Sequence, residues 1–225
     1  MNIKIEDIIE SGITQNEVLL EGYIYSKPEY HHTTHDEKIY DFVLEVPRLN
    51  NSVNDYIPIE VSERTIDIDT LTVDSAIRVT GQFRSYNKPS DDGKRIALRL
   101  FVFVKDIVPI DTVVSTNNIL LDGHICKEPR FRTTPGGREI CDMILAVQRV
   151  YGRSDYIPCI LWSRNARYGS KLPVGTRVFI EGRIQSRQYK KKLDDKGNWE
   201  WRTAYEVSTS RIGMVEETEE EDIQK

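Results

Sequence analysis

The chain has 225 residues, of which 39% are hydrophobic and 30% are charged, and its net charge is −5. Those proportions suit a soluble globular protein, and no apolar run approaches the ~20 residues that a membrane-spanning helix needs. The N-terminus lacks the basic-then-apolar form of a secretory signal, and the three scattered cysteines suit reduced thiols better than disulfides or a zinc site. We therefore expect a cytoplasmic protein that does not enter a membrane.

The first 110 residues predict a short N-terminal element followed by strands. Residues 1–15 are expected to form an arm or a short amphipathic helix. Residues 26–38 are expected to be a polar turn, and residues 62–75 are poor helix material, so that any helix there should be short or irregular. Apolar, β-rich segments bounded by turn signals predict strands at 18–25, 39–46, 56–61, 77–84 and 96–104.

The same plan returns about 100 residues later. Asp55-Tyr56-Ile57-Pro58 recurs as Asp155-Tyr156-Ile157-Pro158, and Gly81-Gln82-Phe83-Arg84-Ser85 recurs as Gly182-Arg183-Ile184-Gln185-Ser186. Two further blocks match in the same order, which indicates a duplicated domain, because solenoid repeats are only about 20–50 residues long. In the second copy, strands are predicted at 119–126, 139–148, 156–161, 177–185 and 204–210, with a helix over 163–171.

Five strands with at most one helix between the third and the fourth is the pattern of the OB-fold, a small five-stranded barrel. We therefore expect an all-β protein with two tandem OB-folds, at residues 16–110 (repeat one) and 117–213 (repeat two). Residues 111–116 would be the linker between them. Residues 214–225 are strongly acidic, and we expect them to form a disordered tail.

The two repeats differ in charge and in aromatic content. Residues 1–116 have a net charge of −8, residues 117–213 of +8, and the tail of −5. In repeat two, aromatic residues alternate with cations. Rings stack on bases with little sequence preference and cations neutralise phosphates, so this mixture predicts binding of single-stranded nucleic acid.

The candidate residues follow from this chemistry. If Ile157, Cys159 and Leu161 face the core, alternation places Tyr156, Ile160 and Trp162 on the outer face of the barrel. The candidate stacking residues are Tyr151, Tyr156, Trp162, Tyr189, Trp199 and Trp201. The candidate phosphate-binding residues are Arg149, Arg153, Arg164, Arg187, Lys190, Lys191 and Lys192.

Residues 181–189, Glu-Gly-Arg-Ile-Gln-Ser-Arg-Gln-Tyr, resemble the fourth-strand signature of bacterial single-stranded DNA-binding proteins, the SSB family. Further matches lie at residues 123, 128–137, 145–147 and 155–162. The resemblance covers about residues 117–212, and residues 16–108 more weakly. It implies non-enzymatic, largely sequence-independent binding of single-stranded DNA in replication, recombination or repair. The family's four aromatic binding positions fall on Tyr151, Tyr156, Trp162 and Tyr189.

Proteins of the family assemble four OB-folds. Because this chain has two, the resemblance implies a homodimer, and it also implies association with the nucleoid. In repeat one the four binding positions are Asn50, Tyr56, Ser62 and Lys88. Repeat one is therefore expected to bind weakly, through Tyr56 and Tyr86, and repeat two to be the principal binder. The family's acidic tail ends in a hydrophobic pair that recruits replication and repair proteins, whereas this chain ends Asp222-Ile223-Gln224-Lys225.

Other chemistry has less support in the sequence. His31, His32 and His35 lie in a predicted turn without carboxylate or cysteine partners at ligand spacing, so we expect no metal site. No phosphate loop, dinucleotide fingerprint or nucleophile elbow is present, so we expect no cofactor and no catalytic residue. The main alternative is a protein-interaction or assembly module, which suits repeat one better. An OB-fold nuclease and an RNA ligand also stay open.

Overall fold

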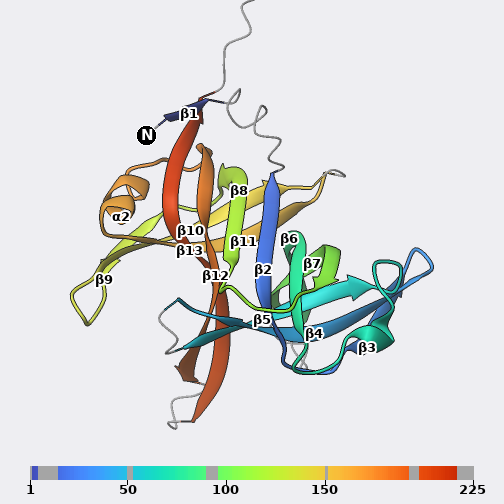
Figure 1. The fold of residues 1–225 in the computed structure, drawn as a ribbon. Helices are drawn as coiled ribbons and strands as arrows, with labels where there is room; N and C mark the ends of the chain where they lie inside the picture. The colour runs from blue at the N-terminus through green and yellow to red at the C-terminus, as the bar shows by residue number, and fades with distance from the viewer. Residues whose placement is uncertain are drawn as a thin grey trace, which may run out of the picture.

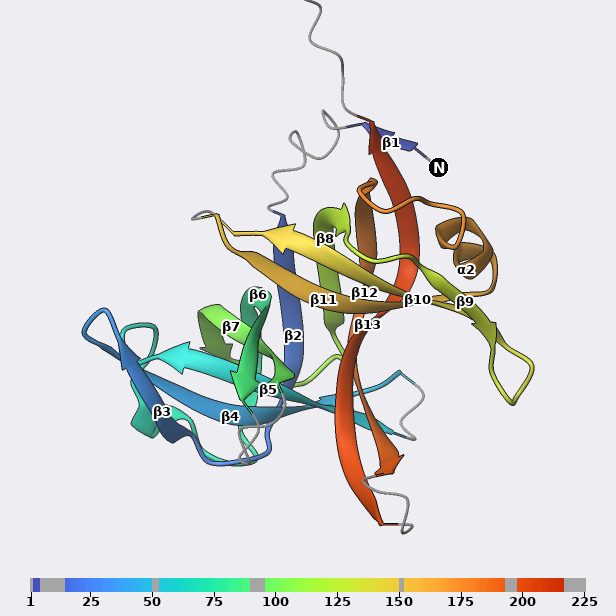
Figure 2. The ribbon, with the colours of Figure 1, turned by 180° about the vertical axis from the view of Figure 1, so that it is seen from behind.

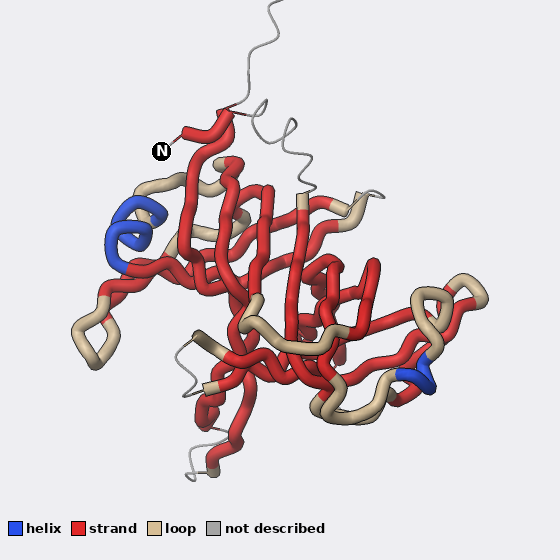
Figure 3. The backbone as a smooth tube through the Cα atoms, in the orientation of Figure 1, coloured by secondary structure: helices blue, strands red, loops and turns tan. Residues whose placement is uncertain are grey.

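The computed structural model describes residues 2–4, 15–49, 53–89, 96–149, 152–192 and 198–216. Repeat one contains β2 (Asn16–Ile24), β3 (Glu29–Thr34), β4 (Glu37–Pro47), β5 (Asn54–Ser62), the 3-10 helix η1 (Ile68–Thr70), β6 (Ala76–Pro89) and β7 (Ile96–Pro109). Repeat two contains β8 (Asn117–Ile125), β9 (Arg130–Thr133), β10 (Glu139–Gln148), β11 (Ser154–Trp162), α2 (Ser163–Gly169), β12 (Arg177–Lys192) and β13 (Trp199–Glu216). Figure 3 shows how strongly strand dominates the chain.

Each repeat closes into a barrel with the same strand pairings. In repeat one the ring runs β2–β4–β5–β7–β6 and returns to β2, with β5 and β7 parallel. In repeat two the equivalent ring runs β8–β10–β11–β13–β12 and returns to β8, with β11 and β13 parallel. The two barrels are visible in Figure 1. The all-β, OB-fold prediction is confirmed.

Alternating apolar residues on these strands fill the barrels. Leu20, Ile57 and Phe83 have no exposed surface in repeat one, and Leu121, Ile157 and Ile184 have none in repeat two. The register therefore follows the apolar pattern, because a slip of one residue would turn the core face of a strand outward. Ile160 is the exception to the predicted outer face. It is buried rather than exposed, because β13 runs alongside and pairs it with Ser208.

Three predicted elements differ in the structure. Residues 29–34 form β3, which pairs with β4, where a polar turn was expected. β13 continues to Glu216, into the predicted tail, where Ile212 and Val215 are buried and Met214 pairs with Val178 of β12. Asn2–Lys4 form the strand β1 against Met214–Glu216 rather than part of a helix. The rest of the N-terminal arm and residues 217–225 lie outside the described residues.

The barrels join through strand pairing and through the duplicated motifs. β2 pairs antiparallel with β8, from Asn16 opposite Leu121 to Leu20 opposite Asn117. The backbone N–H of Tyr156 donates to Ser85 Oγ (2.7 Å), and that of Tyr56 donates to Ser186 Oγ (3.0 Å). The Asp-Tyr-Ile-Pro segment of each repeat is thus hydrogen-bonded to the other repeat's duplicated glycine-to-serine segment, which is residues 81–85 in repeat one and 182–186 in repeat two.

Two buried aspartates complete these contacts. Asp55 accepts from Arg48 (2.7 and 2.8 Å), from Arg183 Nη1 (3.0 Å) and from the backbone N–H of Ser186 (2.8 Å). Asp155 accepts from Arg149 Nε (2.8 Å) and from the backbone N–H of Ser85 (2.6 Å). We call these residues the inter-repeat clasp: Arg48, Asp55, Ser85, Arg149, Asp155, Arg183 and Ser186.

Candidate nucleic-acid interface

The hairpin of β12 and β13 carries most of the predicted site residues. It extends from the second barrel past β4 and β5, as Figure 2 shows. Tyr189 lies opposite Arg202, and Lys190 lies opposite Trp201. Strand side chains alternate between faces. Tyr189 and Trp201 therefore point to opposite sides of the hairpin, although the sequence alone grouped them together.

One face of the hairpin continues the outer face of the second barrel. Arg187 lies 5.7 Å from the ring centre of Tyr189 and 3.6 Å from Glu206. On the neighbouring strand, Trp162 Nε1 donates to Ser208 Oγ (3.0 Å), two residues beyond Glu206 on the same face of β13. Trp162 and Tyr189 therefore belong to one surface, with a cation beside it.

The opposite face carries the two most exposed aromatic residues among those that the structure describes in this repeat. Trp199 and Trp201 are 59% and 64% exposed, and the ammonium of Lys190 lies 5.1 Å from the ring centre of Trp201. Exposed tryptophans beside a lysine are suited to stacking on bases and holding the phosphates between them. By alternation, Thr203 and Tyr205 share this face toward the barrels.

Tyr156, another aromatic candidate in repeat two, is separated from the hairpin. Tyr156 is exposed at the start of β11, and its backbone is held by Ser85 of repeat one. It lies six residues, about 20 Å of strand, from Trp162 at the other end of β11. Tyr151 lies outside the described residues.

The cationic candidates divide into free and occupied groups. Arg149 donates to both oxygens of Asp155 and to the carbonyl of Ser85 (3.0 Å), so its guanidinium holds the repeats together rather than facing solvent phosphate. Its sequence position beside the aromatics had suggested the opposite role. Arg153, Arg164 and Lys190 are exposed, Arg187 is exposed beside Glu206, and Lys191 is half-buried. The side chain of Lys192 is not described.

In repeat one, the two predicted aromatics have different surroundings. Tyr56 is 37% exposed, and its ring centre lies 4.8 Å from that of Tyr25, which is 56% exposed. Tyr86 instead accepts a hydrogen bond from Arg99 (2.8 Å) and packs edge-on against Phe101 (5.6 Å). Burial raises the pKa of Tyr86. Tyr86 is therefore part of a polar cluster rather than an open stacking surface.

That polar cluster occupies the place where repeat two has apolar packing. Glu60, the counterpart of Ile160, is buried between His31 (3.5 Å) and Arg99 (3.3 Å). Burial raises the pKa of Glu60 to about 7, although Arg99 opposes the shift. His31 and His32 lie on β3 rather than in the polar turn that the sequence predicted. No group of three or more His, Cys, Asp or Glu is arranged to hold a metal among the described residues.

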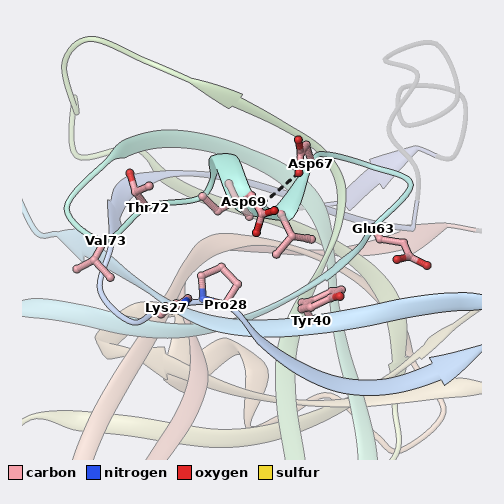
Figure 4. A pocket seen from close by; sticks show the side chains of 10 residues that line it. Lys27, Pro28, Tyr40, Glu63, Asp67, Asp69, Thr72 and Val73 are labelled. Carbon is pink, nitrogen blue, oxygen red and sulfur yellow. Dashed lines mark hydrogen bonds between the residues drawn. The ribbon is translucent and has the colours of Figure 1, made fainter.

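A pocket of about 940 Å³ opens beside η1 in repeat one (Figure 4). Its charged lining consists of Lys27 against Glu63, Asp67 and Asp69. This excess of carboxylates repels a phosphate chain. The pocket therefore does not share the chemistry of the hairpin surfaces.

Residues 116–215 match the model of the single-strand binding protein family. Repeat two is therefore similar to this family over nearly its whole length. "Single-stranded DNA-binding protein 1" of Staphylococcus aureus (strain COL) is 34% identical over an alignment of 80 residues that covers 32% of this chain and 48% of that protein. "Single-stranded DNA-binding protein A" of Bacillus subtilis (strain 168) is 32% identical over an alignment of 80 residues that covers 32% of this chain and 46% of that protein. The chain spans about half the length of these curated SSB relatives.

The solved structures extend the likeness to both repeats. The wild-type single-stranded DNA binding protein from Thermus aquaticus has a TM-score of 0.72 and 21% identity, covering 90% of this chain and 94% of that chain. At this identity the comparison shows a shared fold. The family resemblance predicted from residues 117–212 is thus confirmed. Among the described residues, no helix has the length and apolar character required to cross a membrane.

Proposed function

We propose that this protein binds single-stranded DNA, largely without sequence preference, and that it does so without an enzymatic reaction or cofactor. The observation that carries the proposal is the β12–β13 hairpin, which places the exposed Trp199 and Trp201 beside Lys190 on one face and the half-buried Tyr189 beside Arg187 on the other. The SSB family match over the same repeat supports it, as does the DNA-binding name of its curated relatives.

Binding would combine two interactions. Trp162 and Tyr189 on one surface, Trp199 and Trp201 on the opposite face of the hairpin, and Tyr156 on β11 would each stack on a base, at about 1–3 kcal/mol. The phosphates would be neutralised by a set of cations that excludes Arg149: Arg153, Arg164, Arg187, Lys190 and Lys191. Tyr151 and Lys192 remain in the proposed set on sequence grounds. Because neutralised phosphates release counterions, affinity should fall as salt rises.

The biological setting follows from this activity. Residues 16–110 and 117–213 would act as tandem domains joined by 111–116, and two chains would assemble into a homodimer with four OB-folds. The protein would coat unwound DNA during replication, recombination or repair, in the cytoplasm and associated with the nucleoid. Proteins of those processes are the proposed partners. The acidic residues after Glu216 would compete with DNA for the basic repeat, because both are polyanions.

The test is a titration of the intact protein with a labelled dT oligonucleotide at low and at moderate salt, followed by tryptophan fluorescence. All three tryptophans, Trp162, Trp199 and Trp201, belong to repeat two, so quenching reports on that repeat. We expect strong quenching by dT that weakens with salt, and none by a duplex of equal length. A matched rU oligonucleotide measures the preference for DNA over RNA. No quenching at low salt would refute the proposal.

A further inference from the structure

A cleft of about 560 Å³ lies between the two repeats. Repeat one supplies its floor from the outer faces of its strands, including Val43 and Pro58, and repeat two supplies Thr203 and Tyr205 from β13. The cleft is therefore complete only when both repeats are present. We call it the composite cleft.

An exposed aromatic pair lies at one end of the composite cleft. Tyr25 packs against Tyr56 at 4.8 Å between ring centres, and its backbone N–H donates to the carbonyl of Val43 (2.8 Å) on the cleft floor. Ser26, the next residue, lines the cleft, as does Pro58 on the same face of β5 as Tyr56. The hydroxyl of Tyr56 donates to Glu45 (3.1 Å), which fixes its ring. Two neighbouring tyrosines held in place with their rings in solvent form a preorganised stacking surface.

The opposite wall connects the cleft to the candidate interface of repeat two. Thr203 and Tyr205 share one face of β13 with Trp199 and Trp201 by alternation. A chain stacked on the exposed tryptophans can therefore follow β13 toward the barrels and enter the cleft. The amide of Tyr56 is held by Ser186 of β12, which fixes the two walls relative to each other.

Cations outnumber carboxylates in the lining of the cleft, whereas carboxylates outnumber cations in the pocket beside η1. The cleft is therefore the better binding site for a polyanion. Lys27, Lys88 and Arg99 line it, against Glu29 and Asp41. Arg99 donates to Asp41 (2.8 Å), which leaves the exposed ammonium groups of Lys27 and Lys88 for an incoming phosphate. Cations beside rings and an apolar floor are the features that single-stranded nucleic acid needs from its binding groove.

We propose that the composite cleft binds a second stretch of the same single-stranded nucleic acid, with Tyr25 and Tyr56 stacking on bases and Lys88 contacting phosphate. This inference rests on the proposed function of repeat two. It assigns Tyr25 and the β13 wall to a site that neither repeat could form alone. Repeat one then contributes to binding through residues outside the family's aromatic positions, with Tyr56 as the one position in common.

The experiment compares Tyr25→Ala and Lys88→Ala with wild type in the intact chain, using dT of about 10 and of about 35 nucleotides, since one OB-fold covers ~4–16. The long oligonucleotide should bind Tyr25→Ala roughly 5- to 150-fold more weakly, the loss of one stacked base. Lys88→Ala should lower the salt dependence of long-oligonucleotide binding by about 0.7 in log–log slope. Quenching of repeat two by the short oligonucleotide should stay as in wild type.

Tyr30→Ala is the matched control, because Tyr30 is 58% exposed in the same repeat but does not line the cleft. Tyr30→Ala should bind both oligonucleotides like wild type. Tyr25→Phe keeps the aromatic ring and should retain most of the affinity for the long oligonucleotide. If Tyr25→Ala and Lys88→Ala both bound the long oligonucleotide as tightly as wild type, this inference would be overturned. Quenching of the wild-type protein by dT would in that case still support the proposed function. Equal losses in Tyr25→Ala and Tyr30→Ala would also overturn it.

Discussion

Replacing Asp155 by alanine should destabilise the whole chain, because this carboxylate is the centre of one half of the inter-repeat clasp. Its side chain is 2% exposed and accepts from Arg149 and from the backbone N–H of Ser85. Removing one partner of a buried ion pair costs about 3–5 kcal/mol. The guanidinium of Arg149 is 28% exposed, so water can solvate part of it. We therefore expect the free energy of unfolding to fall by about 2–3 kcal/mol.

The measurement is urea and thermal unfolding followed by circular dichroism, where this loss corresponds to a fall of roughly 5–10 °C in Tm. Asp142→Ala is the matched control. Asp142 accepts two hydrogen bonds from Arg132 (2.6 and 3.1 Å), as Asp155 does from Arg149, but its side chain is 41% exposed. An exposed pair is worth about 0–1 kcal/mol. If both variants lost the same stability, burial between the repeats would not be the source of the effect.

Three further predictions concern the binding surface and the buried acid. The double variant of Trp162 and Tyr189 to alanine should lose about 2–6 kcal/mol of dT affinity with an unchanged circular dichroism spectrum, since each ring stacks on one base; retained affinity would place the DNA elsewhere. Lys190→Ala should lower the log–log salt slope of dT binding by about 0.7, while Lys171→Ala, an exposed lysine that follows α2, should not. Burial raises the folded-state pKa of Glu60 from 4.5 to about 7, so wild type should lose stability as pH rises from about 4.5 to 7. Relative to Glu60→Gln that loss should reach about 3 kcal/mol, measured by urea unfolding at pH 5 and pH 8, and a constant difference between the two proteins would contradict it.

The fold was largely predictable because its signals are local or repeated. Alternating apolar residues defined the strands of both barrels, and the match between residues 55–58 and 155–158 indicated the duplication. β3 was missed because its Glu29–Thr34 segment is polar and half or fully exposed, so that it pairs with β4 without contributing to the core. Such a strand depends on its partner, which a propensity argument cannot see.

The candidate site was less predictable because it depends on partners distant in the sequence. The sequence alone suggests that Arg149 is a surface cation. In the structure its guanidinium instead donates to Asp155 and to the carbonyl of Ser85 in the other repeat. Trp201 and Tyr189 were grouped by proximity in sequence, whereas the register of β12 with β13 places them on opposite faces. Tyr25 was overlooked because its partner Tyr56 is 31 residues away along the chain.

The clasp also explains which parts of the duplication persist within this chain. Repeat one has Ser62 where repeat two has Trp162, yet it keeps Asp55 and Ser85 as counterparts of Asp155 and Ser186. These retained aspartates and serines contact the other repeat, whereas the position of Ser62 and Trp162 lies on the outer face of its own barrel. Shared motifs in this chain therefore report the packing of the two barrels rather than equal binding by both. Because Ser85 holds the backbone of Tyr156, repeat one positions a proposed stacking residue of repeat two, and the proposed binding surface belongs to the pair of repeats as a unit.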